Sequence, residues 1–177
     1  MMIGRVAAGL LLAALAMEPA AAKELAFTAR LSGDQAPTLK DSTATGQARL
    51  IVDTERQTVD LTLDVAGLTT DQLWDRLVAA PVGPIHLHLY GHDHGGAASA
   101  SLALPVPYGP SYSATAGGFR VVVKGYPYAA GATLVKSTVP FDAFVTSLRQ
   151  GAIVLNIHTD RATDGEISGT MTRATLP

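Results

Sequence analysis

Apolar and polar residues alternate over most of this chain, and this period of two is the feature that most restricts its fold. The clearest run consists of Val59, Leu61, Leu63 and Val65, separated by Asp60, Thr62 and Asp64. Successive side chains of a β-strand point to opposite faces, so this alternation is typical of a strand with one buried face. Residues 25–31 and 48–52 follow the same pattern.

Other segments complete the expected secondary structure. β-Branched runs at 119–124 and 152–158 and a threonine-rich stretch at 166–173 also predict strands, with glycine-containing turns between them. In residues 70–80 and 141–150 the apolar residues instead recur at helical spacing. We therefore expect an all-β fold, a Greek-key β-sandwich or barrel, with two short helices.

The first 22 residues have the composition of an export signal. Arg5 supplies a positive charge, residues 6–17 form an apolar run, and residues 19–22 carry small residues that a signal peptidase reads. The apolar run is too short for a stable membrane span. We expect cleavage after Ala22, which leaves a single β-domain at residues 23–177, with no membrane span, in the periplasm or outside the cell.

The composition argues against several kinds of binding partner and against stabilisation by disulfide bonds. The chain has 13 Lys and Arg against 15 Asp and Glu, a net charge of -2, without a basic patch. This charge balance argues against binding to nucleic acid or to a membrane surface. The chain has no cysteine, so an exported form must depend on core packing rather than on disulfides.

All five histidines fall in two short segments. His86, His88, His92 and His94 lie within residues 85–95, and the fifth is His158. Imidazole offers a lone pair at neutral pH and has high affinity for divalent metals. This clustering predicts a metal site built from two distant parts of the chain.

Strand geometry suggests how such a site could form. His86 and His88 are two residues apart and should share one face of a strand, while Ile85, Leu87 and Leu89 face the core. His158 follows an equivalent alternation. If the two strands are neighbours, three imidazoles converge on the outer face of the sheet and could hold one ion.

The remaining polar residues near the histidines leave several interpretations open. His92 and His94 stand between glycines, so we expect a loop that closes the site, holds a second ion or is solvated. Asp160 and Asp164 could accept an imidazole N–H and so fix a tautomer, or they could be turn residues. Glu166 reads as a strand residue beside a turn.

Several short motifs occur in a fixed order along the chain. They are Ala29-Arg-Leu-Ser-Gly33, Thr45-Gly-Gln-Ala-Arg49, Val65-Ala-Gly-Leu68, Ile85-His-Leu-His88, Leu148-Arg-Gln-Gly151, Leu155-Asn-Ile-His-Thr159 and Gly165-Glu-Ile-Ser-Gly169. In this order they resemble the CHRD family, a β-domain first described in chordin and common in exported bacterial proteins. Ser168 and Thr170 depart from the family pattern, which usually has Arg and Gln there. The loop around His92 and His94 is richer in histidine than is typical of the family.

A looser resemblance is to Cu/Zn superoxide dismutase, where a β-sandwich presents a His-x-His pair and a late strand ends in a copper-binding histidine. This resemblance implies that His86, His88 and His158 correspond to three copper ligands, and that the fold is superoxide dismutase-like or immunoglobulin-like. The chain lacks that family's cysteines and has no recognisable zinc subsite. A shared fold and a partial site do not establish a shared reaction.

Three functions compete at this point. The first is an exported copper-binding protein for storage, buffering or delivery, with zinc as the alternative metal. The second is a copper-only dismutase-like enzyme, for which Arg161, Arg120 and Lys124 could supply positive charge. The third is a metal-free adhesion or assembly module with an envelope partner. For that module an aromatic contact surface would be formed by Tyr108, Tyr112, Tyr126 and Tyr128. No nucleophile–base pair is recognisable, which argues against hydrolase chemistry.

Overall fold

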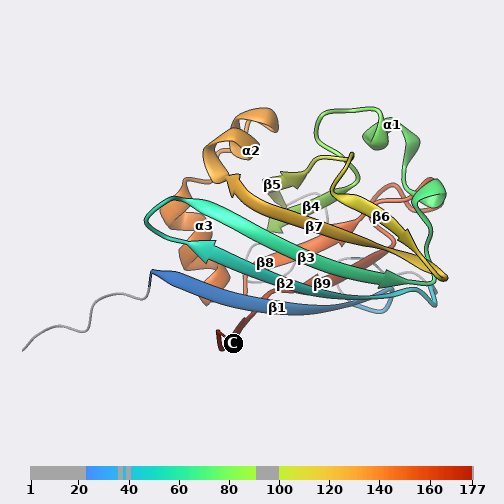
Figure 1. Cartoon of the computed structure of the whole chain (residues 1–177), viewed down its shortest axis with the longest axis horizontal. Coiled ribbons are helices and arrows are strands. Elements are labelled where there is room, and N and C mark those ends of the chain that lie inside the picture. The colour runs from blue at the N-terminus through green and yellow to red at the C-terminus, as the bar shows by residue number, and fades with distance from the viewer. Residues whose placement is uncertain (1–22, 36–37, 39–40, 91–99, 177) are drawn as a thin grey trace, which may run out of the picture.

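The computed structural model describes residues 23–35, 38, 41–90 and 100–176. Within these residues one antiparallel sheet of ten strands makes up most of the fold (Figure 1). The strands are β1 (Glu24–Ser32), β2 (Thr45–Asp53), β3 (Thr58–Ala66), β4 (Ile85–Leu89), β5 (Ser101–Val106), β6 (Tyr112–Thr115), β7 (Gly118–Pro127), β8 (Ile153–Ile157), β9 (Ile167–Thr170) and β10 (Thr172–Ala174). The helices are η1 (Thr70–Gln72), α1 (Asp75–Val78), α2 (Tyr128–Leu134) and α3 (Phe141–Arg149).

The strands are arranged in the order β5-β4-β8-β9-β1-β2-β3-β7-β6, and β10 pairs with residues 26–28 of β1. The join between β9 and β1 is short, a single registered pair of Ser32 with Ser168. We call β5, β4, β8 and β9 the site layer, and β1, β2, β3, β7 and β6 the meander layer. Side chains from both layers meet in one core, as Leu50 and Leu61 do with Leu87 and Leu104. The predicted all-β sandwich or barrel is confirmed.

The meander layer follows directly from the alternation in the sequence. Leu61 and Leu63 are at most 2 % exposed, whereas Asp60 and Asp64 point to the other face and pair with Lys124 and Arg120 on β7. β2 and β3 pair without a shift over their whole length, from Thr45–Ala66 to Asp53–Thr58. A slip of one residue would move every apolar side chain to solvent, so burial fixes this register.

The helical segments agree only in part with expectation. The helix predicted at 141–150 is present as α3, which begins after Pro140 and buries Phe144 and Leu148. The continuous helix predicted at 70–80 is wrong: η1 and α1 are separated by Leu73 and Trp74. Both of these residues have extended backbone because they pair with the chain after β8. Tertiary pairing here overrides the local helical periodicity.

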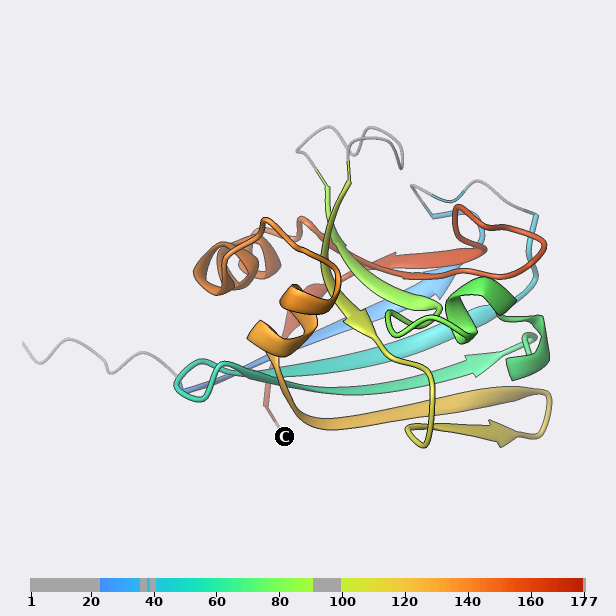
Figure 2. The same cartoon turned by 90° about the horizontal axis from the view of Figure 1, so that it is seen from above.

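The helices lie at opposite ends of the sheet. Figures 1 and 2 place α2 and α3 at one end, and η1, α1 and the loop that follows β8 at the other. α2 was not expected; Tyr128 at its start packs against Phe144 of α3. Among the described helices, none is long and apolar enough to cross a membrane. The predicted export signal at 1–22 lies outside the described residues.

Candidate metal centre

The two strands that carry the histidines are neighbours. β4 pairs with β8 in antiparallel register, with His86 opposite Asn156 and Ile85 opposite Ile157. His158 follows β8 by one residue and donates its backbone N–H to the carbonyl of Pro84. The three imidazoles therefore gather on one face of the site layer, as the strand alternation predicts, while Ile85 and Leu87 face the core.

The face of the sheet that carries the three imidazoles is covered rather than open to solvent. His86 is 5 % exposed and His158 is 8 % exposed, whereas His88 is half-buried. The segment with η1 and α1 is responsible for part of this cover. Trp74 donates its backbone N–H to the carbonyl of His158, and the two rings lie 6.5 Å apart. Trp74 therefore contacts a residue of the site.

The three imidazoles could hold a metal ion. One nitrogen from each of His86, His88 and His158 lies within 4.8 Å of the others. Nδ1 of His86 and Nε2 of His158 are 3.1 Å apart. Two nitrogens about 2.0 Å from one ion are separated by roughly 3.1 Å when the angle at the ion is about 100°. This pair is therefore already spaced as two ligands of one ion, and a nitrogen of His88 lies within 4.8 Å of both, close enough for His88 to act as a third ligand.

Backbone carbonyls fix which nitrogens can donate. Nε2 of His86 lies 2.9 Å from the carbonyl oxygen of Gly83, and Nδ1 of His158 lies 2.8 Å from that of Thr163. A carbonyl oxygen can only accept, so both of these ring nitrogens carry the proton. In the neutral rings the facing atoms, Nδ1 of His86 and Nε2 of His158, then both present lone pairs. Two lone pairs 3.1 Å apart repel each other, and a cation between them removes that repulsion.

The environment keeps the rings neutral. Burial, with smaller contributions from His158 and His88, lowers the pKa of His86 to about 3. Burial and the neighbouring His158 lower the pKa of His88 to about 4. Burial also lowers the pKa of His158, against the hydrogen bond to Thr163 and the charge of Asp164. Neutral imidazole is the form that binds metal, so all three rings are ready to coordinate near neutral pH.

His88 differs from the other two histidines in its hydrogen bonding. Both of its ring nitrogens are buried, and neither has a partner among the residues that the structure describes. Buried polar atoms in folded proteins are nearly always paired. The ring of His88 lies beside the rings of His86 and His158. Its unpaired nitrogens make His88 a candidate metal ligand.

The loop after β8 supplies the acceptor for His158, but not through the residues that the sequence suggested. Asp160 accepts the backbone N–H of Asp75 at the start of α1. Asp160 and Asp164 are both exposed. The imidazole N–H instead meets the carbonyl of Thr163. The interpretation that Asp160 or Asp164 accepts the imidazole N–H is therefore wrong, and both residues lie in the turns of this loop. A carbonyl has no signature in the sequence, which is why the actual acceptor was missed.

His92 and His94 lie outside the described residues, so their predicted part in the site remains a prediction.

The four tyrosines that could form the aromatic contact surface of an assembly module are not all exposed. Tyr128 is 3 % exposed and donates its hydroxyl proton to the carbonyl of Val139, whereas Tyr108 is 37 % exposed. Tyr112 and Tyr126 are half-buried and pack against the core.

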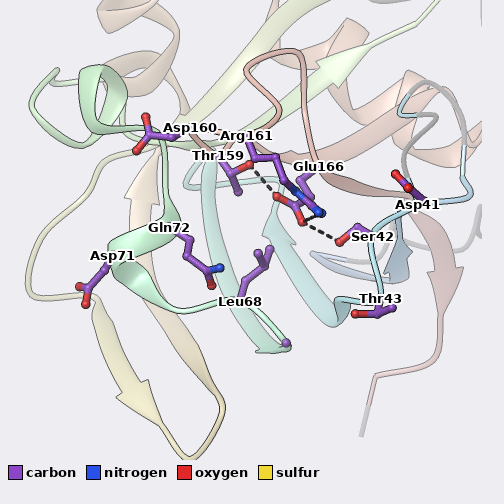
Figure 3. A pocket seen from close by; sticks show the side chains of 11 residues that line it. Asp41, Ser42, Thr43, Leu68, Asp71, Gln72, Thr159, Asp160, Arg161 and Glu166 are labelled. Carbon is purple, nitrogen blue, oxygen red and sulfur yellow. Dashed lines mark hydrogen bonds and ion pairs between the residues drawn. The ribbon is translucent and has the colours of Figure 1, made fainter.

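A polar pocket of about 520 Å³ is lined in part by Thr159, the residue that follows His158 (Figure 3). Glu166, Arg161, Thr159 and Ser42 form one hydrogen-bonded group in it, with Leu68 and Gln72 nearby. Glu166 lies between a turn and β9, close to the expectation of a strand residue beside a turn, but it is only 3 % exposed and has three side-chain partners that the sequence did not reveal. Glu166 directly precedes β9, which itself contains Ser168 and Thr170, so a polar residue here is unremarkable in the sequence, and alternation alone does not reveal which partners surround it.

The CHRD domain model matches residues 27–171, which is most of the chain, and the protein belongs to the CHRD family. The matched region contains all three histidines of the candidate centre and Glu166. No curated protein and no solved structure matches the chain.

Proposed function

We propose that this protein is an exported copper-binding protein that stores, buffers or delivers the ion through His86, His88 and His158. The observation that supports this most directly is the 3.1 Å separation of Nδ1 of His86 and Nε2 of His158, whose other ring nitrogens both lie against backbone carbonyls, so that the two facing nitrogens form a pair of opposed lone pairs in the neutral rings. Such a pair is unfavourable in the metal-free protein and becomes favourable when one ion lies between the two nitrogens. His88, with both nitrogens unpaired among the described residues, supplies a third ligand.

Copper fits this ligand set better than the other common divalent ions. Imidazole nitrogens favour copper, zinc, iron and nickel over the oxygen-seeking magnesium and calcium. Among first-row divalent ions, affinity for a given nitrogen site is highest for copper. Zinc is the competitor, because three histidines also hold zinc in other proteins.

Binding is a better proposal than superoxide dismutation. Dismutation gains from positive charge along the approach of the anion. Each cation considered for that task is already paired with a carboxylate: Arg161 with Glu166, Arg120 with Asp64 and Lys124 with Asp60. Arg120 and Lys124 also belong to β7 in the meander layer rather than to the layer of the histidines.

Copper titration of the mature protein without a His-tag tests the proposal. We expect one tight copper site, and a loss of about 100-fold or more in affinity for His86→Ala and for His158→Ala, since each removes a ligand. Ser147→Ala is the matched control, because Ser147 is a polar residue with 8 % exposure in α3, remote from the histidines. The proposal is wrong if both histidine variants keep the stoichiometry and affinity of the wild type.

The same preparations separate binding from catalysis. Copper-loaded protein should dismutate superoxide no faster than an equal concentration of free copper, with the metal-free protein as a blank. A rate clearly above that of free copper would replace the storage and delivery role with the enzymatic one. Competition between copper and zinc in the same titration decides which metal the site prefers.

A further inference from the structure

Glu166 is a buried carboxylate near the metal centre, and its side chain is not one of the three candidate ligands. Glu166 lies between Gly165 and the start of β9 with 3 % exposure. An ionised carboxylate at such a position is costly unless it is paired and hydrogen-bonded. Burial alone would raise the pKa of Glu166, yet hydrogen bonds from Thr159, Ser42 and Arg161 together lower this pKa below its ordinary value.

The partners of Glu166 show what the carboxylate holds in place. Oε2 accepts the hydroxyl proton of Thr159 at 2.6 Å, and Oε1 accepts that of Ser42 at 2.7 Å. The guanidinium of Arg161 donates to Oε1 as well. Figure 3 shows the carboxylate between these groups. Thr159 and Arg161 both belong to the loop that begins directly after His158, so two of the three donors tie that loop down.

Thr159 passes this restraint on to the rest of the loop. Its hydroxyl oxygen accepts the backbone N–H of Ala162 at 3.1 Å, and its own N–H donates to the carbonyl of Ala162 at 3.3 Å. Ala162 in turn accepts the N–H of Gly165. This closed turn presents the carbonyl of Thr163 to Nδ1 of His158 at 2.8 Å.

The return strand fixes the other end of the turn. Glu166 donates its backbone N–H to the carbonyl of Ile157 at 2.7 Å, one residue before His158. Gly165 adopts φ +118° and passes so close to Asn156 that a Cβ there would lie 2.2 Å from its side-chain oxygen. The turn therefore has little room to adopt another shape, and the side chain of Glu166 closes its open side.

We propose that Glu166 is a positioning residue of the metal centre, which acts through Thr159 and the 160–165 turn to hold His158 with Nδ1 on the Thr163 carbonyl and Nε2 toward the ion. This inference rests on the proposed function for its metal-binding consequence. Its structural part, the tautomer of His158, exists without metal and can be measured separately. Partners that orient a ligating histidine commonly change metal affinity by about 10- to 100-fold when they are removed.

The first measurement uses metal-free protein. The ring ¹⁵N chemical shifts of His158 should show one tautomer, protonated at Nδ1, in the wild type. In Thr159→Val and in Glu166→Gln we expect a mixture of tautomers, because the Thr163 carbonyl is no longer held against the ring. Thr159→Ser keeps the hydroxyl and should restore the single tautomer.

The second measurement is copper affinity together with the electron paramagnetic resonance spectrum of the Cu(II) form. Thr159→Val and Glu166→Gln should bind copper about tenfold or more weakly, with altered copper hyperfine splitting. Asp53→Asn is the matched control, because Asp53 is a carboxylate with 7 % exposure that accepts backbone N–H groups in the β2–β3 hairpin. It should change stability without changing the copper spectrum.

The outcomes separate the two proposals. If the wild type binds no copper, the proposed function fails, and the tautomer measurement still decides the role of Glu166. If the wild type binds copper and the Thr159→Val and Glu166→Gln variants keep both its affinity and its single tautomer, Glu166 is not a positioning residue. If Glu166→Gln does not fold, the pair Thr159→Val and Thr159→Ser decides the inference, since it differs by one hydroxyl.

Discussion

The two layers of the sheet use their buried positions in different ways. The meander layer buries apolar side chains, and in its described strands Asp53 at the end of β2 is the one buried charged residue. The site layer and the loop that joins β8 to β9 bury apolar side chains too, such as Ile85 and Leu87, but they also bury several polar groups. These groups are His86, Asn156, His158, Thr159, Glu166 and Ser168.

This difference shows where stability and function lie in the molecule. Apolar burial contributes about 25 cal/mol per Å² of surface removed from water, so the meander layer stabilises the fold. A buried polar group is at best a small net gain when it is hydrogen-bonded, and a cost when it is not. The site layer therefore carries a functional arrangement that the rest of the core must stabilise. Four predictions test this contrast.

The largest expected effect on stability is in the meander layer. Leu61→Ala removes a side chain that is 2 % exposed in β3. It should lower the free energy of unfolding by about 2–5 kcal/mol, because both apolar contact and packing are lost. Urea unfolding measures the change. Copper affinity of the folded protein should be unaltered, and a marked loss of affinity would contradict the separation of the two layers.

The site layer should make stability depend on pH. Histidine in the unfolded chain titrates near pH 6.5, whereas in the folded protein the pKa is about 3 for His86 and about 4 for His88. Between these values the unfolded chain binds more protons, so acid destabilises the metal-free fold. The loss begins below about pH 6.5 and amounts to at most about 1.4 kcal/mol per pH unit for each histidine. Thermal unfolding at several pH values between 4.5 and 7 measures it, and a flat profile would contradict neutral buried imidazoles.

A smaller effect of opposite sign is expected from removing the unpaired histidine. His88→Leu replaces two buried nitrogens that lack partners among the described residues. It should raise the free energy of unfolding of the metal-free protein by about 1 kcal/mol and abolish the gain in Tm on adding copper. Thr62→Leu, on the polar face of β3, is the control and should leave the copper response intact. A metal-free His88→Leu protein that is clearly less stable would show that the ring has a structural role.

The smallest effect is expected at a surface ion pair of the meander layer. Asp64 and Arg120 lie 3.4 Å apart, with about half of each side chain exposed. Asp64→Asn should change the free energy of unfolding by less than about 0.5 kcal/mol, because solvent and salt screen such pairs. Unfolding curves at low and high salt check this, and a change above 1 kcal/mol would mean that the outer face contributes more than expected.

The accuracy of prediction from the sequence differs between the meander layer and the segment that carries η1 and α1. Residues 59–65 alternate strictly, and β3 and its pairing with β2 follow from that pattern. Residues 70–80 have helical periodicity, yet Leu73 pairs with Thr159 and keeps the backbone extended. Local pattern decides structure where it agrees with the burial of a face, and long-range pairing decides it where the two compete.

The sequence by itself determined the all-β fold, the alternation that buries one face of each strand, and the identity of the three imidazoles, because these depend on side-chain chemistry and a period of two. Only the tertiary structure decided that β4 lies beside β8, that the carbonyls of Gly83 and Thr163 accept the histidine protons, and that Glu166 is buried among hydroxyls. The sequence alone does not show where a backbone carbonyl lies or which side chains are buried. Both are decided when distant segments pack against each other.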